Sequence, residues 1–307
     1  MTQPKTINEF LNRSRSLAAI DMGSNATRIS IVHVDAQGLL EEDFSRRYPL
    51  RLASSAFSKG YADKNDVAAI LDVYRDIAWH LKDRKVDRYR AIATSAMRTL
   101  RNRQALIDAV REETGIKIEV ISGKEESSLA RRALLAAVGT MPPKTLFVDL
   151  GGGSLEVSLD KVSTSLPLGN VRLLTLFPAL AGVCSKSDLR DCMTHVVDAV
   201  HKACGKLTAE RAFGIGGTLL ILAEHAPEPD CEFPTISIEA LAAMSKKLMG
   251  LSAEDRQKKF DVRADRADIL LTATAVVLAL AQHFELTTLT VPRTGIRQAM
   301  LQDLAAK

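Results

Sequence analysis

The sequence has 307 residues, of which 46% are hydrophobic and 25% are charged, and its formal net charge at pH 7 is +4. These values are ordinary for a soluble globular protein, and the length is enough for two domains that each bury a core. The small positive charge does not by itself indicate a nucleic-acid-binding protein, although it is compatible with an anionic substrate.

Targeting and redox features favour a cytoplasmic protein. Residues 1–16 are polar and lack the apolar core of a signal peptide. The longest apolar run, residues 269–281, contains two threonines and is too short to span a bilayer, so we expect a buried helix. The four cysteines form no C-x-x-C pair and show no zinc spacing with histidine, so we expect reduced, mostly buried thiols. Neither a membrane nor a nucleic acid is expected as a partner.

The first half of the chain predicts alternating strands and helices. Residues 17–34 predict a strand, a glycine turn and a second strand, and residues 39–51 predict a third strand. A helix follows at 64–84, where apolar residues recur at helical spacing and Asp63 or Asn65 could cap the start. The remaining predicted elements of this half are a strand at 90–93, a helix at 102–114 ending at Gly115, a strand at 117–121 and a helix at 125–137.

The second half repeats this plan more loosely. Two prolines at 142 and 143 break the chain, and we take them as the linker. A second strand–turn–strand unit follows at 145–159. The other predicted elements are strands at 163–168, 211–215 and 288–291, and helices at 173–180, 187–206, 219–224, 238–249, 253–259, 266–284 and from 295 onward. Alternating strands and helices predict an α/β protein whose sheets are covered by helices.

Two of the glycine turns are near-duplicates. The turns at 21–26 and 149–154 each begin with an aspartate that is followed, two residues later, by a glycine. Aligning the two aspartates also aligns Arg28 with Glu156. Matching turns suggest two similar domains that face each other, with both turns aimed at one cleft. Backbone N–H groups in such turns bind anions and the aspartates can hold a cation, so the pattern predicts phosphate chemistry.

A third glycine turn, at 214–218, also follows a predicted strand. Glycine lets a phosphate approach the backbone without meeting a Cβ. None of the three turns is a Walker A loop, because no Gly-Lys-Ser/Thr follows, and none fits the Rossmann fingerprint.

Four short motifs occur along the chain: AIDMGSN at 19–25, ATSAMR at 93–98, VISGKEE at 120–126 and VDLGGGSLE at 148–156. In this order they resemble the exopolyphosphatase/guanosine pentaphosphate phosphohydrolase family of the actin-like ATPase superfamily. Residues 168–173 and 294–297 resemble further segments of that family, so the resemblance covers nearly the whole chain from about residue 16.

The resemblance implies an α/β fold of two ribonuclease-H-like (actin-like) domains with the active site in the cleft between them. We assign residues 1–140 to the first domain and residues 141–294 to the second, and the terminal helix at 295–307 could return to the first domain. Longer members of the family continue into an added helical domain, so this chain resembles a short, two-domain member. A homodimer is one of the oligomeric states that the sequence allows.

The resemblance also implies roles for individual residues. Glu126 matches the catalytic base, with Glu125 as the alternative, although Ser127 replaces the alanine common in the family. Arg98 matches an arginine that contacts phosphate, as a forked donor would. The expected phosphate-binding residues are Gly23, Ser24, Asn25, Thr94, Ser95, Gly151, Gly152, Gly153, Ser154, Gly216, Gly217 and Thr218. The expected ligands of a divalent cation, Mg²⁺ or with a monovalent cation as the alternative, are Asp149, Glu156 and Asp21.

Plainer interpretations exist for these residues. Two glutamates at a helix start are often only an acidic first turn, and a single arginine is often a surface cation. The family match outweighs these interpretations for Glu126 and Arg98. The other basic residues, Arg47 and Arg51 among them, are individually interpreted as solvated, although a subset could line a path for a long polyanion.

The resulting hypothesis is a hydrolase that releases terminal orthophosphate from inorganic polyphosphate by in-line attack of water, assisted by a metal ion. The alternative substrate is the 5′ end of guanosine pentaphosphate, which has the same terminal bond. Two alternatives from other classes are an actin-like kinase or ATPase that binds ATP, and a non-catalytic sensor of nucleotide or phosphate. The retained acidic residues count against the sensor, because a binding protein does not need a base.

Overall fold

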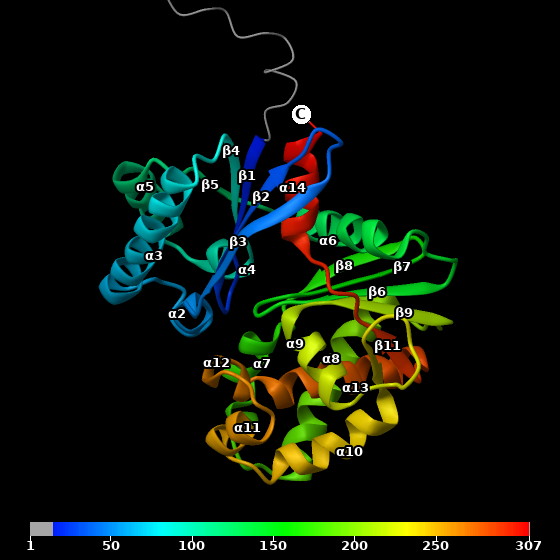
Figure 1. Cartoon of the computed structure of the whole chain (residues 1–307). Helices are drawn as coiled ribbons and strands as arrows, with labels where there is room; N and C mark the ends of the chain where they lie inside the picture. Colours follow the sequence, from blue (N-terminus) through cyan, green and yellow to red (C-terminus); the bar gives the residue numbers. More distant parts are fainter. Residues whose placement is uncertain (1–14, 307) are drawn as a thin grey trace, which may run out of the picture.

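The structure is a computed structural model that describes residues 15–306. Two domains of strands and helices lie one above the other (Figure 1). The first domain has a five-stranded sheet and the second has a six-stranded sheet. The chain is therefore an α/β protein, as the alternating elements predict.

The first sheet has the strand order β3-β2-β1-β4-β5. Strands β1, β2 and β3 form an antiparallel meander, whereas β4 and β5 run parallel to β1. The bounds of β1 to β5 are Arg15–Met22, Thr27–Val34, Leu40–Tyr48, Arg88–Ala93 and Ile118–Val120. β1 is buried from Ser16 to Met22, as expected for a central strand that is covered on both faces.

Helices cover both faces of the first sheet. Ala18 and Ile20 of β1 belong to one apolar cluster with α3 and α5, whereas Leu17 and Ala19 belong to a second cluster with α6 and α14. This division follows from the alternation of side chains along a strand. The helices of this domain are α2 (Leu52–Ser58), α3 (Lys64–Asp83), α4 (Ser95–Thr99), α5 (Arg103–Thr114), α6 (Gly123–Val138) and α14 (Ile296–Ala305).

The second sheet has the order β10-β11-β9-β6-β7-β8. Its strands are β6 (Thr145–Leu150), β7 (Leu155–Leu159), β8 (Val162–Leu166), β9 (Arg211–Ile215), β10 (Thr235–Ser237) and β11 (Thr288–Thr290). The segment β8-β7-β6-β9-β11 matches the whole first sheet in order and direction. The two domains therefore share one topology, which the duplicated turns predict.

The helices of the second domain surround a long, buried helix. They are α7 (Asn170–Leu176), the 3₁₀ helix Pro178–Ala181, α8 (Lys186–Cys204), α9 (Gly217–His225), α10 (Ile238–Met249), α11 (Ala253–Lys259), α12 (Ala264–Ala267) and α13 (Leu270–Phe284). The stretch Ala264–Phe284 is apolar and long enough to cross a membrane, but 78% of its most apolar window is buried inside the protein. α13 is thus the buried helix that the apolar run predicts.

Helix α6 contacts both domains. Leu129 and Ala133 pack on the first sheet, whereas Ala130 and Leu134 pack against Phe147 of the second sheet. Because positions three and four apart share a helix face, a single helix can present one apolar stripe to each sheet. α6 therefore sets the spacing of the two domains on one side of the cleft.

Most boundaries agree with the sequence predictions, and several short elements were missed. Asp63 caps α3 and Gly115 ends α5 in the left-handed region, as predicted. The predicted strand at 39–51 ends at Tyr48, and the short helix α2 that follows was not predicted. Helix α4 and strand β10 were not predicted either. All of these missed elements are short, so packing against distant segments decides their conformation more than local propensity does.

Gly169 lies against the backbone of the second glycine turn. A Cβ at this position would lie 2.3 Å from the backbone nitrogen of Gly153, so the backbone would have to move. We expect Gly169→Ala to lower the free energy of unfolding by about 3 kcal/mol, at the upper end of overpacking effects. The control is Gly182→Ala, whose Cβ would meet no atom within 4 Å. Urea denaturation compares the two variants, and equal midpoints would contradict the prediction.

Candidate active site

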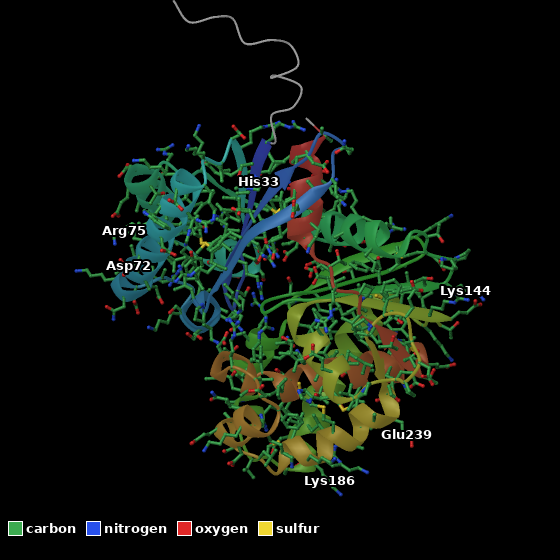
Figure 2. The ribbon with its side chains drawn as sticks, in the orientation of Figure 1. His33, Asp72, Arg75, Lys144, Lys186 and Glu239 are labelled. Atoms are coloured by element: carbon green, nitrogen blue, oxygen red, sulfur yellow. The ribbon has the colours of Figure 1, made fainter. Side chains whose placement is uncertain are left out.

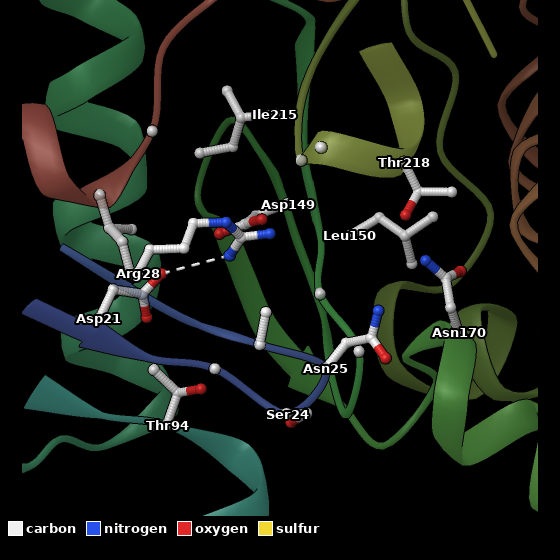
Figure 3. A pocket seen from close by; sticks show the side chains of 18 of the residues that line it. Asp21, Ser24, Asn25, Arg28, Thr94, Asp149, Leu150, Asn170, Ile215 and Thr218 are labelled. Atoms are coloured by element: carbon white, nitrogen blue, oxygen red, sulfur yellow. Dashed lines mark ion pairs between the residues drawn. The ribbon is translucent and has the colours of Figure 1, made fainter. Parts of the chain in front are cut away.

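A cavity of about 340 Å³ lies between the two domains (Figure 3). All three glycine turns line it, together with Asp21, Asp149, Glu126 and Thr94. The first two turns sit at the equivalent places of the two sheets, because β1 pairs with β2 as β6 pairs with β7. The register places Asp21 opposite Arg28 and Asp149 opposite Glu156, which is the alignment that the sequence gives.

The first two turns touch each other across the cleft. Each is closed in the same way: the N–H of Gly23 donates to Ala26 at 3.0 Å, and the N–H of Gly151 donates to Ser154 at 3.1 Å. A Cβ on Gly153 would lie 2.7 Å from Ser24 Oγ and 2.6 Å from Ser95 Oγ. The turns and the segment after β4 therefore converge on one point, where backbone and hydroxyl donors surround a space for an anion.

Four carboxyl groups gather at this cleft, of which Asp21, Glu126 and Glu156 are buried and Asp149 is partly exposed. Asp21, Glu126 and Asp149 line the cavity, whereas Glu156 is fully buried and is not among the lining residues. One oxygen of Glu156 accepts a hydrogen bond from Ser165 at 2.7 Å. The other oxygen is buried and has no partner among the described residues. A buried carboxylate oxygen without a donor is costly unless another ligand satisfies it.

Burial and crowding weaken the acidity of these groups. Burial, and then the neighbouring Glu156 and Glu126, raise the pKa of Asp149 well above its ordinary value. Burial, followed by repulsion from Glu156, raises the pKa of Glu126 to about 8, although the Arg98 guanidinium acts in the opposite direction. Burial also raises the pKa of Asp21, against the effect of Arg28. Burial is thus the main cause of the raised pKa values, and repulsion between the neighbouring carboxyl groups adds to it.

These residues fit a divalent cation that also binds phosphate. Among residues 15–306, no three His, Cys, Asp or Glu side chains converge closely enough to ligate a metal ion by themselves. Mg²⁺ usually takes only one or two carboxylates and completes its shell with water and phosphate oxygens. The repulsion between the neighbouring Asp149 and Glu156 carboxyls and the unpartnered oxygen of Glu156 agree with a cation of that kind.

Adjacent Glu125 and Glu126 point in different directions. Glu125 pairs with Arg90 at 2.7 Å, and its side chain is 45% exposed. Glu126 lines the cavity and pairs with Arg98 at 2.8 Å, with 9% of its side chain exposed. Of the two, only Glu126 is therefore positioned to reach a group bound in the cavity.

Arg98 lies behind the cavity. It donates to the Glu126 carboxylate at 2.8 Å and to the carbonyl oxygen of Ile121 at 3.0 Å, and it is not among the lining residues. In this conformation Arg98 orients Glu126, and its expected contact with phosphate stays a prediction. The other expected phosphate-binding residues, from Gly23 through Thr218, all line the cavity.

Several polar residues that the sequence prediction missed also line the cavity. Arg28 lies 3.6 Å from Asp21 (Figure 3). Arg266 donates to Thr218 Oγ1, and the described residues include no carboxylate in an ion pair with it. Burial, and then Arg28 and Arg47, lower the pKa of Arg266 to about 9. Arg297 and Asn170 lie in segments that already resembled the family, so those matches were the available signal. Arg266 gave none.

A protein-family model for the Ppx/GppA phosphatase family matches residues 30–307. The chain belongs to this family. Curated Ppx/GppA relatives include exopolyphosphatase 1 of Mycobacterium tuberculosis, which is 32% identical over 51% of this chain. That alignment covers 47% of the relative, so the matched part spans about half of its length. Exopolyphosphatase 2 of the same organism is 26% identical and matches 94% of both chains. The guanosine-5′-triphosphate,3′-diphosphate pyrophosphatase of Photobacterium profundum is 24% identical over 94% of this chain and 59% of its own.

Solved structures show the same Ppx/GppA fold. An exopolyphosphatase from Cytophaga hutchinsonii has a TM-score of 0.85 at 22% identity, with 95% of this chain and 98% of that chain covered. The Aquifex aeolicus family member has a TM-score of 0.77 at 23% identity, with 96% and 98% covered. At these identities the likeness supports the fold alone, and it confirms the predicted pair of actin-like domains.

The raised pKa of Glu126 predicts how stability depends on pH. Its ordinary pKa is 4.5 and its folded pKa is about 8, so between these values the folded protein keeps a proton that the unfolded chain has lost. Raising the pH from about 5 to about 8 therefore favours unfolding, by up to about 1.4 kcal/mol per pH unit for this group. Comparing urea denaturation of the metal-free wild type with that of Glu126→Gln isolates the contribution of Glu126 to the pH dependence of stability. The wild type should lose stability relative to the variant as the pH rises, and parallel curves would contradict this.

Proposed function

We propose that this protein is a phosphoanhydride hydrolase that releases the terminal orthophosphate of inorganic polyphosphate. The observation that carries the proposal is the convergence of two aspartate-bearing glycine turns and a buried, cavity-lining Glu126 on one space. Membership of the Ppx/GppA family and the curated exopolyphosphatase relatives support it.

In the proposed mechanism, the chain acts mainly by positioning and electrostatics. Ser24 and the backbone N–H groups of Gly152 and Gly153 bind the terminal phosphoryl group. Arg28 and Arg266 face the next phosphates, where an anion relieves the repulsion between these two cations. Glu126 accepts a proton from, or orients, a water molecule for in-line attack, and Arg98 holds the Glu126 carboxylate in place.

We propose Mg²⁺ as the cofactor. Asp149 and Glu156 would hold it, and it would supply positive charge to the phosphate oxygens. The proximity of the Asp149 and Glu156 carboxyls, each with a raised pKa, supports a cation site at this place.

A second candidate substrate is guanosine pentaphosphate, hydrolysed at its 5′ end. One specific observation favours it: the cavity extends to the third turn, where Ile215 and Leu220 add apolar surface beside Arg266. Such a wall suits a nucleoside better than a bare polyphosphate, which has no apolar part. The relative from Photobacterium profundum, named for a guanosine pentaphosphate substrate, supports the same alternative.

The location is proposed as cytoplasmic. All four cysteines are free, with Cys192 and Cys204 buried, Cys184 half-buried and Cys231 exposed. Unpaired thiols are usual where glutathione and thioredoxin keep cysteines reduced.

The decisive test measures orthophosphate release from tripolyphosphate, long-chain polyphosphate and guanosine pentaphosphate, with and without Mg²⁺. Glu126→Gln should fold normally and lose about 10²–10⁴-fold in kcat, because it removes the general base. Glu125→Gln is the matched control, since its side chain points to Arg90 and solvent, and it should stay close to wild type. The proposal fails if the wild type releases no phosphate, or if Glu125→Gln is the inactive variant.

The metal assignment has its own test. Asp149→Asn should raise the Mg²⁺ concentration for half-maximal activity by about tenfold or more, because it removes one charged ligand. The control is Asp230→Asn, an exposed aspartate in the left-handed region, where asparagine is well tolerated. Activity is titrated against Mg²⁺ for both variants. An unshifted curve for Asp149→Asn would remove Asp149 from the metal site.

A further inference from the structure

Two arginines of the first domain form ion pairs with two aspartates of the second. Arg47 pairs with Asp265, and Arg51 pairs with Asp268, although both arginines were expected on solvated faces. Their side chains are only 13% and 22% exposed. We call these four residues, together with Asn25, the interdomain clasp.

Arg51 makes the most extensive contacts in the clasp. It binds Asp268 through both terminal nitrogens, one of them at 2.8 Å from Oδ1. The same guanidinium donates to the carbonyl oxygen of Asp265 at 2.7 Å, and its Nε donates to Asn25 Oδ1 at 2.8 Å. A forked, bidentate contact of this kind is directional, so it fixes orientation as well as distance.

Asn25 connects the clasp to the phosphate-binding turn. Its amide nitrogen donates to the Asp265 carbonyl oxygen at 3.0 Å and lies 3.3 Å from Asp265 Oδ2. Asn25 itself lines the cavity at the tip of the first turn. The tip of a turn in the first domain is thus held by an aspartate from the second.

The clasp also brackets a cavity-lining cation. Arg266 lies between Asp265 and Asp268 in the sequence, on the short helix α12, and its side chain enters the cavity. The segment that carries Arg266 is therefore tied to the first domain on both sides, through Asp265 and Asp268. Burial lowers the pKa of Arg266, and the nearby cations Arg28, Arg47 and Arg263 lower it further, so the closed arrangement works against the repulsion among these arginines.

We infer that Arg51, Asp265 and Asp268 are positioning residues, which hold the cleft closed and keep Asn25 and Arg266 at the cavity. The inference that the clasp holds the cleft closed needs no ligand, because it is drawn from the ion pairs. The inferred effect on substrate binding rests on the proposed function. Breaking a partly buried pair leaves its partner uncompensated, so loss of Asp268 should favour an open cleft.

The closure is tested by a distance measurement that needs no substrate. Asp72 on α3 and Lys186 on α8 project outward from the two domains (Figure 2). Each is replaced by cysteine and spin-labelled, in a background with Cys184→Ser and Cys231→Ser. Asp268→Asn should shift the distribution of distances between the two spin labels relative to the labelled protein that keeps Asp268. In that labelled protein, 1 M salt should shift the distribution in the same direction, because salt screens the ion pairs.

The catalytic consequence is tested with tripolyphosphate and Mg²⁺. Asp268→Asn should raise KM by about tenfold, in the range of typical coupling energies, with a smaller change in kcat. Arg51→Lys keeps the charge but loses the fork, so it should fall between this variant and wild type. If Asp268→Asn does not fold, Arg51→Lys is judged by the same two measurements.

The matched control is Asp83→Asn, which removes an exposed pair with Arg84 inside the first domain. It should change neither the distance nor KM. The inference is overturned if the clasp variants leave the distance distribution unchanged, or if Asp83→Asn shifts it equally. Absence of tripolyphosphate hydrolysis in the wild type would instead count against the proposed function, since the distance measurement stands without it.

Discussion

The fold depends on holding four acidic side chains together in the cleft between two domains, three of them buried and Asp149 partly exposed. Asp21 and Glu126 come from the first domain, and Asp149 and Glu156 come from the second. Their repulsion raises the cost of closing the cleft, and Arg28, Arg98 and Arg297 offset part of it. Positive charge brought by a ligand would therefore favour the same arrangement that presents the catalytic groups, which couples binding to closure.

The cleft is closed by contacts of different kinds on its different sides. Helix α6 spaces the sheets, and an apolar cluster that includes Ala53, Val171 and Ile269 joins the domains near α2 and α7. The clasp lies beside this apolar cluster, because Arg51 and Asp268 are close in sequence to Ala53 and Ile269, and it adds charged contacts there. Apolar burial has no direction, whereas a forked arginine has one, so the clasp is the element that can set a defined closed geometry.

The sequence predicted the fold class and the duplicated turns because both depend on local patterns. It favoured Glu126 over Glu125 by motif position alone, since adjacent residues in a first turn look alike. Helix phase agrees with this choice: Glu126 lies in the middle of the buried stripe that includes Leu129 and Ala130, whereas Glu125 lies at its edge. Arg266 and the interdomain pairs could not be predicted, because their partners lie about 50 to more than 200 residues away.

Helix α14 has a consequence for how the chain is made. It packs Ala299 and Leu301 against Leu17 and Ala19 of β1, yet it follows the entire second domain in the sequence. During synthesis at about 5–20 residues per second, this apolar side of β1 has only α6 to cover it for many seconds. The nascent chain therefore exposes part of β1 to aggregation and to chaperone capture until α14 emerges from the ribosome.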